Sequence, residues 1–239
     1  MTLTLALDTA TDVASIAVAD AGRVLVELAL PDRRHAAVLL PGITNALQML
    51  GASLRDVGRV LCADGPGSFT GIRIGLATAQ GIVHANAAVT AGTLPSLLAT
   101  AWGAAPFADG PVVAVYDGLR GDLFGAAYRF GADRVDVLAP PLLGSFAELR
   151  ARVAERPGLV VGDLAVLDPA AVAAWTGRAP VAAGPRAAAL IALDGVAGGI
   201  ADIPDLAAFA PDYGRPAEAQ ARWERAHGRR LPDTRGEYR

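Results

Sequence analysis

The sequence predicts an α/β protein of two lobes, the second of them reduced. Short apolar strand patterns alternate with helical patterns, a linker rich in alanine, glycine and proline interrupts the chain at 105–111, and a glycine-rich turn joins a buried strand to a long helix. We expect the first lobe at residues 1–105 and the second at 106–213. Residues 214–239 are predicted to form a basic C-terminal helix or a disordered tail.

The first lobe has the predicted order β-β-β-α-β-α-β-α. Strand patterns occur at 3–8, 13–19, 23–30, 59–63 and 87–92, and helical patterns at 35–50, 71–86 and 95–102. Pro41 and Gly42 predict a kink or a late start in the first helix. Three strands followed by crossover helices indicate a sheet that carries helices against its faces.

The second lobe follows a shorter version of the same plan. Strands are predicted at 112–117, 122–130, 134–138 and 159–161, and helices at 145–155, 169–175 and 185–199. No sequence repetition between the two halves accompanies this similarity of order.

The glycine-rich turn at 64–71 reads Asp-Gly-Pro-Gly-Ser-Phe-Thr-Gly. Glycine and proline favour a turn that other residues adopt only at a cost. Such a turn leaves backbone N–H groups at a helix N-terminus, where an anion or a partner can bind. The sequence lacks the Lys-[Ser/Thr] ending of a Walker loop and the Gly-x-Gly-x-x-Gly spacing. A purely structural turn is the alternative.

This turn and its continuation to Gly75, together with residues 5–11, resemble the TsaB (YeaZ) family. Weaker similarities to that family occur at 117–124 and 211–215. Members of the family are non-catalytic subunits of the bacterial machinery that makes threonylcarbamoyladenosine in tRNA. The resemblance implies the actin-like ATPase fold (ASKHA, ribonuclease-H-like).

The resemblance also implies a role as a scaffold or activating subunit. In that role the chain would bind its catalytic paralogue TsaD, which transfers threonylcarbamoyl to adenosine 37 of ANN-decoding tRNAs. The ATPase subunit TsaE and tRNA, reached through the complex, would be further partners, and a homodimer is expected when TsaD is absent.

Two stripes on the first two helices are the candidate partner surface. Both stripes contain apolar or small residues at helical spacing. They consist of Leu39, Ile43 and Leu47 on one helix, and Gly71, Gly75 and Ala79 on the other. Packing against the chain's own sheet is the alternative. The resemblance favours the partner surface, since the family builds its subunit interface from these two helices.

A remnant nucleotide or phosphate loop is the second candidate site. Its residues are Asp8, Thr9, Gly65, Gly67, Ser68, Thr70 and Gly71. Asp8 ends the first strand, where the actin-like superfamily places an aspartate for Mg²⁺ and phosphate, although Asp8 and Thr9 could simply cap a turn. Residues 112–213 contain no convincing second phosphate loop, so we expect no cofactor of its own. Whether a nucleotide binds at the interface of the complex stays open.

No catalytic residue or metal site is predicted. His35 has Leu rather than His four residues later, which excludes a shared ion on one helical face, and His84 and His227 are isolated. Ser68 lacks the Gly-x-Ser-x-Gly elbow of a serine nucleophile and is expected to cap the following helix. An active ATP-dependent kinase of the superfamily, or a protease that cleaves the paralogue, are the alternative functions.

Composition excludes several other classes of protein. The 239 residues are 53% apolar and 19% charged, with a net charge of −3. All basic residues other than histidine are arginine, which excludes a Schiff-base or phosphate-binding lysine.

The arginine-rich tail is either solvated or an arm for tRNA phosphates. No membrane span or signal peptide is apparent, so we expect a cytoplasmic protein.

Overall fold

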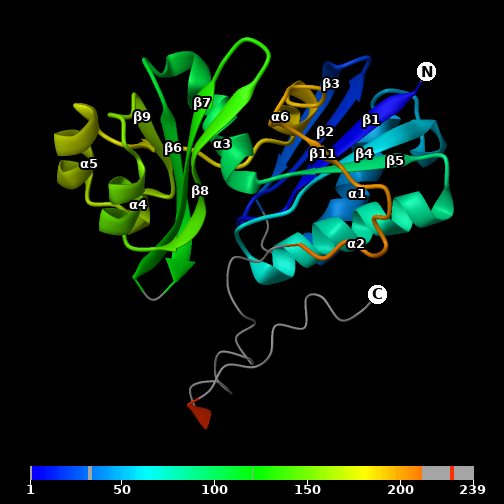
Figure 1. Cartoon of the computed structure of the whole chain (residues 1–239). Coiled ribbons are helices and arrows are strands. Elements are labelled where there is room, and N and C mark those ends of the chain that lie inside the picture. Colours follow the sequence, from blue (N-terminus) through cyan, green and yellow to red (C-terminus); the bar gives the residue numbers. More distant parts are fainter. Residues whose placement is uncertain (1, 32–33, 120, 212–226, 229–239) are drawn as a thin grey trace.

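The computed structural model of the chain describes residues 2–31, 34–119, 121–211 and 227–228. Two sheets lie side by side in it (Figure 1). The first sheet contains β1 (Leu3–Asp8), β2 (Ala14–Asp20), β3 (Arg23–Leu30), β4 (Val57–Ala63), β5 (Thr90–Leu94) and β11 (Ala201–Asp202). The second contains β6 (Val112–Leu119), β7 (Asp122–Phe130), β8 (Val135–Gly144), β9 (Leu159–Gly162) and β10 (Val181–Ala182).

The two sheets share one topology. In the first, β1, β2 and β3 pair antiparallel, and β1, β4 and β5 pair parallel. In the second, β6, β7 and β8 pair antiparallel, and β6, β9 and β10 pair parallel. The expected two-lobed, actin-like α/β fold is therefore confirmed, with the second lobe as a smaller copy of the first.

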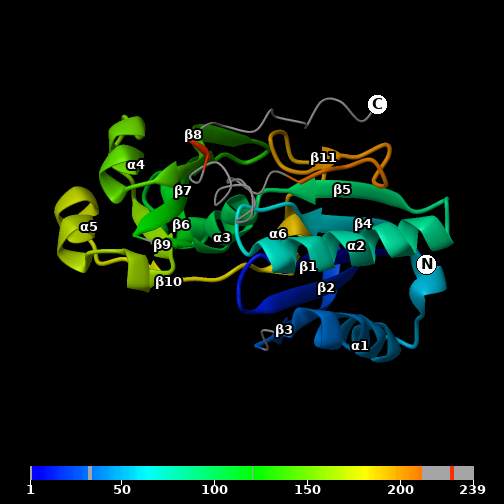
Figure 2. The ribbon, with the colours of Figure 1, turned by 90° about the horizontal axis from the view of Figure 1, so that it is seen from below.

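Helices and the two sheets form five layers. The helices are α1 (His35–Gln48), α2 (Phe69–Ala85), α3 (Ser96–Ala104), α4 (Phe146–Arg152), α5 (Pro169–Thr176) and α6 (Ala187–Ala192), with short 3₁₀ helices η1 (Leu54–Asp56), η2 (Ala105–Phe107) and η3 (Leu164–Val166). Helices α1 and α2 cover one face of the first sheet (Figures 1 and 2). Helices α3 and α6 lie between the sheets, and α4 and α5 pack on the far side of the second sheet.

Strand alternation in the sequence sets these layers. In β1, Leu5 and Leu7 face α1 and α2, whereas Ala6 belongs to the core between the lobes. In β6, Ala114 faces the core between the lobes and Val113 faces α4 and α5. Successive side chains of a strand point to opposite faces, so each strand contributes to two cores.

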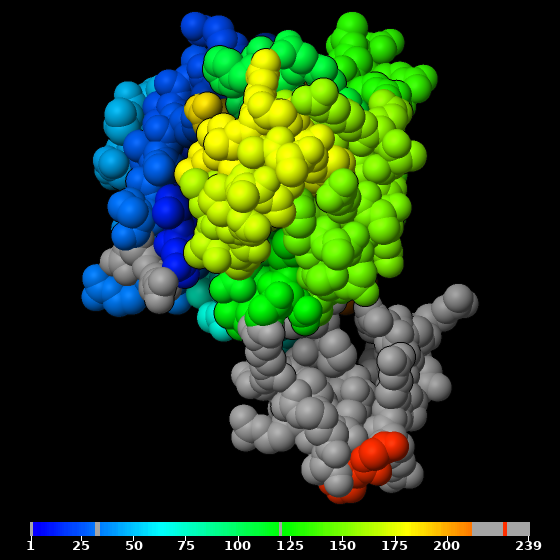
Figure 3. Space-filling view, turned by 90° about the vertical axis from the view of Figure 1, so that its left-hand side faces the viewer, coloured from blue at the N-terminus to red at the C-terminus, as the bar shows by residue number. Residues whose placement is uncertain are grey.

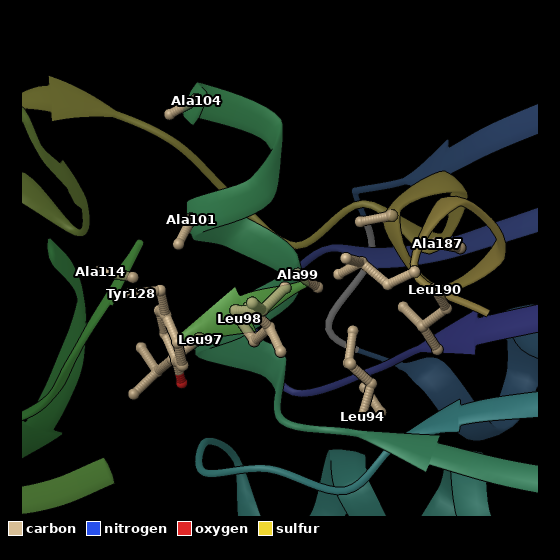
Figure 4. Close-up of a cluster of buried hydrophobic side chains, with 14 of the residues drawn as sticks. Leu94, Leu97, Leu98, Ala99, Ala101, Ala104, Ala114, Tyr128, Ala187 and Leu190 are labelled. Carbon is tan, nitrogen blue, oxygen red and sulfur yellow. The ribbon is translucent and has the colours of Figure 1, made fainter. Parts of the chain in front are cut away.

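The core between the lobes is centred on α3. Its Leu97, Leu98 and Ala101 are buried against Tyr128 of β7 on one side and Leu190 of α6 on the other (Figure 4). Alanine is frequent in this cluster, and small side chains allow the sheets to approach the shared helices closely.

Helix α1 begins at His35 as predicted and continues through Pro41, so of the two expectations for Pro41 and Gly42 the late start is wrong. Leu39 and Ile43 of α1 are fully buried against the first sheet. Burial of this stripe compensates for the backbone hydrogen bond that proline cannot donate.

Helix α6 is shorter than predicted, ending at Ala192 rather than near residue 199. Gly195 and Gly198 have φ angles of +82° and +76°, which glycine adopts easily and which end the helical path. Strand β5 begins at Thr90, three residues later than predicted, because Asn86 accepts a hydrogen bond from the Ala88 N–H and forms a turn there.

The chain returns to the first lobe after the second sheet. Helix α6 packs on β1, β2 and β3, and β11 pairs with β5. The guanidinium of Arg59 on β4 holds this returning segment through ion pairs of 2.6 Å with Asp194 and 2.7 Å with Asp202. The second lobe is therefore connected to the first both by the chain that leads into it and by the segment that follows it. Figure 3 shows the second lobe, green to yellow, in front, with the blue residues of the first lobe at its side.

Within the described residues, no helix is long and apolar enough to cross a membrane. The predicted tail at 214–239 lies outside the described residues except for 227–228, and residues 212–215 of the weak C-terminal similarity also lie outside them.

Candidate functional site

The glycine-rich turn lies between β4 and α2 and rests directly on the end of β1. Gly67 has a φ of +156°, and a Cβ atom there would lie 2.3 Å from the carbonyl oxygen of Ala10. The Ser68 N–H donates to that same oxygen at 2.7 Å. The turn therefore requires glycine at 67 because the backbone after β1 occupies the space that a side chain would need.

Ser68 is the N-cap of α2, as predicted from the sequence. Its Oγ accepts a hydrogen bond from the Gly71 N–H at 3.2 Å. This bond satisfies one of the N–H groups that a helix leaves free at its start. The side chain of Ser68 thus has a structural task, and Thr70 lies exposed in the first turn of the same helix.

Thr9 fixes the start of α2 against β1. Its hydroxyl donates to the Gly71 carbonyl oxygen at 2.8 Å, and both residues are buried. A Cβ atom at Gly75 would lie 2.4 Å from Thr9 Oγ1 and 3.5 Å from the sulfur of Cys62. The small residues of α2 therefore permit close contact with the chain's own sheet.

Asp8 is completely buried beside the turn. Its Oδ1 accepts a hydrogen bond from the Ala10 N–H at 3.0 Å, but its Oδ2 has no hydrogen-bond partner. Burial raises the pKa of Asp8 to about 7; the bond from Ala10 opposes the increase and the nearby Asp64 carboxylate adds to it. The Ser96 side chain also favours the carboxylate, although its Oγ makes no hydrogen bond of standard geometry.

Three buried hydroxyl groups that the sequence did not single out surround this carboxylate region. Ser96 begins α3, and its N–H donates to the carbonyl oxygen of Gly65 in the turn. Tyr116 of β6 donates from its hydroxyl to the Ser96 carbonyl oxygen at 3.0 Å, and Tyr128 of β7 has a buried hydroxyl without a partner. Of these three residues, only Ser96 had a signal in the sequence, the predicted helix start at Pro95-Ser96. The two tyrosines belong to the second lobe, so nothing in the local sequence places them near the turn.

The end of β5 closes the turn from the other side. The Asp64 N–H donates to the carbonyl oxygen of Leu94 at 3.1 Å, while Ser96 holds Gly65. The seven residues of the predicted loop therefore lie near one another, and their role as a remnant nucleotide or phosphate loop stays a prediction. Several of their polar groups, however, form hydrogen bonds with neighbouring parts of the chain.

The six residues predicted as a partner surface are buried inside the chain. Leu39, Ile43 and Leu47 are at most 1% exposed, and Ala79 is fully buried. Gly71 and Gly75 are buried against Thr9, which directly follows β1. The stripes therefore pack on the first sheet, and their assignment as a free binding face is corrected. Helical spacing identifies an apolar face but not which body covers it.

The outward faces of the same helices carry no acidic side chain, and their basic side chains are Arg73 and the exposed His84 in the last turn of α2. On α1, Leu40 is 51% exposed and Thr44 is exposed. On α2, Ala77 and Gly81 are exposed, and Arg73 lies with its guanidinium carbon 5.3 Å from the centre of the Phe69 ring. The inward stripes were predicted as the partner surface because the small residues of α2 allow another helix to approach closely and α1 offers aliphatic side chains.

The other candidate residues do not assemble with this site. His35 is buried, and its Nε2 lies 2.7 Å from the Thr11 carbonyl oxygen. Among the described residues, no group of three or more histidine, cysteine, aspartate or glutamate side chains is placed to hold a metal ion. Burial raises the pKa of the Cys62 thiol well above its usual range, so this thiol is unreactive near neutral pH.

Comparisons with known proteins agree with the resemblance seen in the sequence. Residues 27–165, more than half of the chain, match the family model described as "TsaD: tRNA N6-adenosine threonylcarbamoyltransferase". The tRNA threonylcarbamoyladenosine biosynthesis protein TsaB of Escherichia coli is 35% identical over 130 residues, which are 52% of this chain and 54% of that protein. The chain thus matches about half the length of that relative.

A second relative matches along nearly the whole chain. TsaB of Bacillus subtilis is 26% identical over 229 residues, which are 92% of this chain and 96% of that protein. Among solved structures, a protein with similarity to peptidase YeaZ from Pseudomonas aeruginosa has a TM-score of 0.71 at 24% identity, over 90% of this chain and all of that one. YeaZ from the same organism has a TM-score of 0.65 at 24% identity, over 82% of this chain and 91% of that one.

These structural likenesses support the fold that the two sheets show. The sequence matches reach the glycine-rich turn and the helices around it, the part of the chain with the most specific motifs. The chain belongs to the TsaB (YeaZ) family, within the broader family that the TsaD model describes.

Proposed function

We propose that this chain is a non-catalytic subunit of the machinery that forms threonylcarbamoyladenosine at adenosine 37 of ANN-decoding tRNAs. The relatives from Escherichia coli and Bacillus subtilis are named as proteins of this biosynthesis. In the proposal, the chain supports a TsaD-type paralogue that performs the transfer, together with TsaE and tRNA. Its site of action is then the cytoplasm, where tRNA is modified.

The closed glycine-rich turn is the observation that supports a non-catalytic role. A phosphate loop needs free N–H groups and a carboxylate that can reach a metal–phosphate group. Here the N–H groups of Ser68 and Gly71 donate within the chain, and Asp8 is fully buried. A nucleotide phosphate could bind only if the contacts between the turn and Ala10 opened.

The outward faces of α1 and α2 are the surface that we propose for the paralogue. Charged side chains are depleted from the cores of protein interfaces, and α1 contains none. Leu40 offers an apolar contact, while Ala77 and Gly81 allow a partner helix to approach closely. A paralogue of the same ancestry could present an equivalent face, and a second copy could use it in a homodimer.

ATP hydrolysis separates this proposal from a kinase-like activity. The purified chain should show no ATP turnover above a no-enzyme blank, alone or with acetate and sugars as acceptors. Turnover that the Asp8→Ala variant loses would establish an active member of the superfamily and contradict the proposal.

Incubation with the TsaD paralogue tests the protease alternative. We expect the paralogue to stay intact, and Ser68→Ala to change nothing, because Ser68 Oγ accepts from the Gly71 N–H in the α2 cap. Cleavage of the paralogue that Ser68→Ala abolishes would contradict the pseudo-enzyme role.

A further inference from the structure

A cavity of about 620 Å³ lies beside α3, where the second lobe meets the segment that returns to the first, and its lining includes no residue of the glycine-rich turn. Its walls are the C-terminal part of α3, strand β9, and the segment 178–186, which carries β10 and leads the chain back to the first lobe. Helix α3 starts at the turn with Ser96, whereas the cavity contacts the helix from its middle to its C-terminal end, at Thr100, Gly103 and Ala104. The volume lies within the range of small-molecule sites.

The lining is mainly apolar and made of small residues. Leu159 and Val161 form one wall, and Phe107, which is 75% exposed, stands at the edge. Alanine and glycine at 182–184 leave the space open, and a Cβ atom at Gly184 would meet no atom within 4 Å. An apolar ligand body of moderate size therefore fits this space.

The charged residues of the cavity lining are two arginines. Arg178 and Arg186 both line it, whereas their ion-pair partners Asp109 and Glu27 are not among the lining residues. Arg178 is held by the Phe107 carbonyl oxygen at 3.3 Å and by Asp109, whose side chain is 82% exposed. A pair so open to water is screened and leaves its cation available to a second anion.

The position of Arg186 is also fixed. Its Cδ would lie 3.7 Å from a Cβ atom at Gly103, so its aliphatic stem lies over α3. The guanidinium is anchored by Glu27 of β3. A guanidinium held in place binds a carboxylate with little further loss of side-chain entropy.

From this arrangement we propose that the cavity is a binding site for a small amphipathic monoanion, an apolar body that carries one carboxylate. The apolar part contacts Leu159 and Val161, and the carboxylate binds Arg178 and Arg186 at the edge. This site is separate from the proposed role in tRNA modification and does not depend on it.

Three probes with one chain length and three charges test the proposal. Octanoate, octanol and octylammonium would be titrated into the full chain by calorimetry. Octanoate should bind one-to-one and at least tenfold more tightly than octanol, and octylammonium more weakly than octanol. Equal binding of all three probes, or no one-to-one binding of octanoate, would overturn the proposal.

Variants then locate the site. Gly184→Phe should fill the cavity and abolish octanoate binding, whereas Val137→Phe, at a position of β8 that is 51% exposed and lies outside the cavity lining, should bind octanoate as the wild type does. Arg178→Gln should reduce the preference for octanoate over octanol at least fivefold, with unchanged circular dichroism. Octanoate binding that survives Gly184→Phe in a folded protein places the site elsewhere and refutes the assignment.

Discussion

At the scale of single residues, the buried Asp8 should make the stability of the fold depend on pH. Its pKa is raised from 3.8 to about 7, because burial disfavours the carboxylate. The folded state therefore binds this proton more tightly than the unfolded state, and the contribution of Asp8 to the free energy of unfolding is greatest below pH 4. This contribution falls as the pH rises towards 7, by roughly 4 kcal/mol in total.

Replacing Asp8 with asparagine should remove that pH dependence. The amide oxygen can still accept from the Ala10 N–H, and no charge is buried above pH 7. We expect Asp8→Asn to be more stable than the wild type at pH 8 and to change less between pH 5 and pH 8, measured by urea unfolding. The exposed Asp122→Asn serves as control. A steeper pH dependence in Asp8→Asn would contradict the assignment.

Thr9 and Gly75 should be coupled energetically, since a Cβ atom at 75 would lie 2.4 Å from Thr9 Oγ1. Gly75→Ala is expected to destabilise the fold by about 1–3 kcal/mol through overpacking, despite the better helix propensity of alanine. Thr9→Ala should relieve the clash, so the double variant should be more stable than the sum of the single effects predicts. Additive losses in chemical denaturation would show that the two side chains do not compete for this space.

At the scale of elements, α1 and α2 show what the sequence could and could not predict. Their helical character followed from the spacing of Leu39 and Ile43 and from the Ser68 cap. Which side of α2 meets the sheet did not follow, because that depends on Thr9 and Cys62, residues distant in sequence that approach Gly75 only in the folded chain. The hydroxyls of Tyr116 and Tyr128 were missed for the same reason, as they reach the site from the other lobe.

Two arginine substitutions distinguish the two faces of α2. Gly81→Arg places its side chain on the exposed face, so the variant should unfold at the wild-type temperature but lose the TsaD-type paralogue at least a hundredfold in affinity. Gly75→Arg should instead fail to fold, because its side chain would meet Thr9. Wild-type binding by a folded Gly81→Arg would place the interface elsewhere.

At the scale of the whole molecule, the order of elements predicted both lobes, because hydrophobic alternation and the linker are local signals. The return of α6 and β11 to the first sheet was not predicted, since β11 has only two residues and is paired by a distant strand. Arg59 contributes to this return. Its hydrogen bond to Asp194, together with Asp202, raises the pKa of its guanidinium, and its side chain is only 23% exposed.

Loss of this arginine should loosen the connection between the lobes. Arg59→Gln is expected to lower the free energy of unfolding by about 1–3 kcal/mol, since two carboxylates lose a charged partner. Limited proteolysis between Asp194 and Asp202 should become faster. Arg129→Gln, which breaks a more exposed ion pair with Glu155, should have little effect. Equal effects of the two variants would assign no special role to Arg59.

The most direct test of the central claim is the formation of threonylcarbamoyladenosine in a reconstituted reaction. The mixture would contain the TsaD-type paralogue, TsaE, threonylcarbamoyl-adenylate, ATP and an ANN-decoding tRNA, and the modified nucleoside would be measured by mass spectrometry. If the chain is a required non-catalytic subunit, formation of the modified nucleoside should depend on its presence. The folded Asp8→Asn variant should then support product formation at the wild-type level. Full product formation without the chain, or loss of product with a folded Asp8→Asn, would contradict the account.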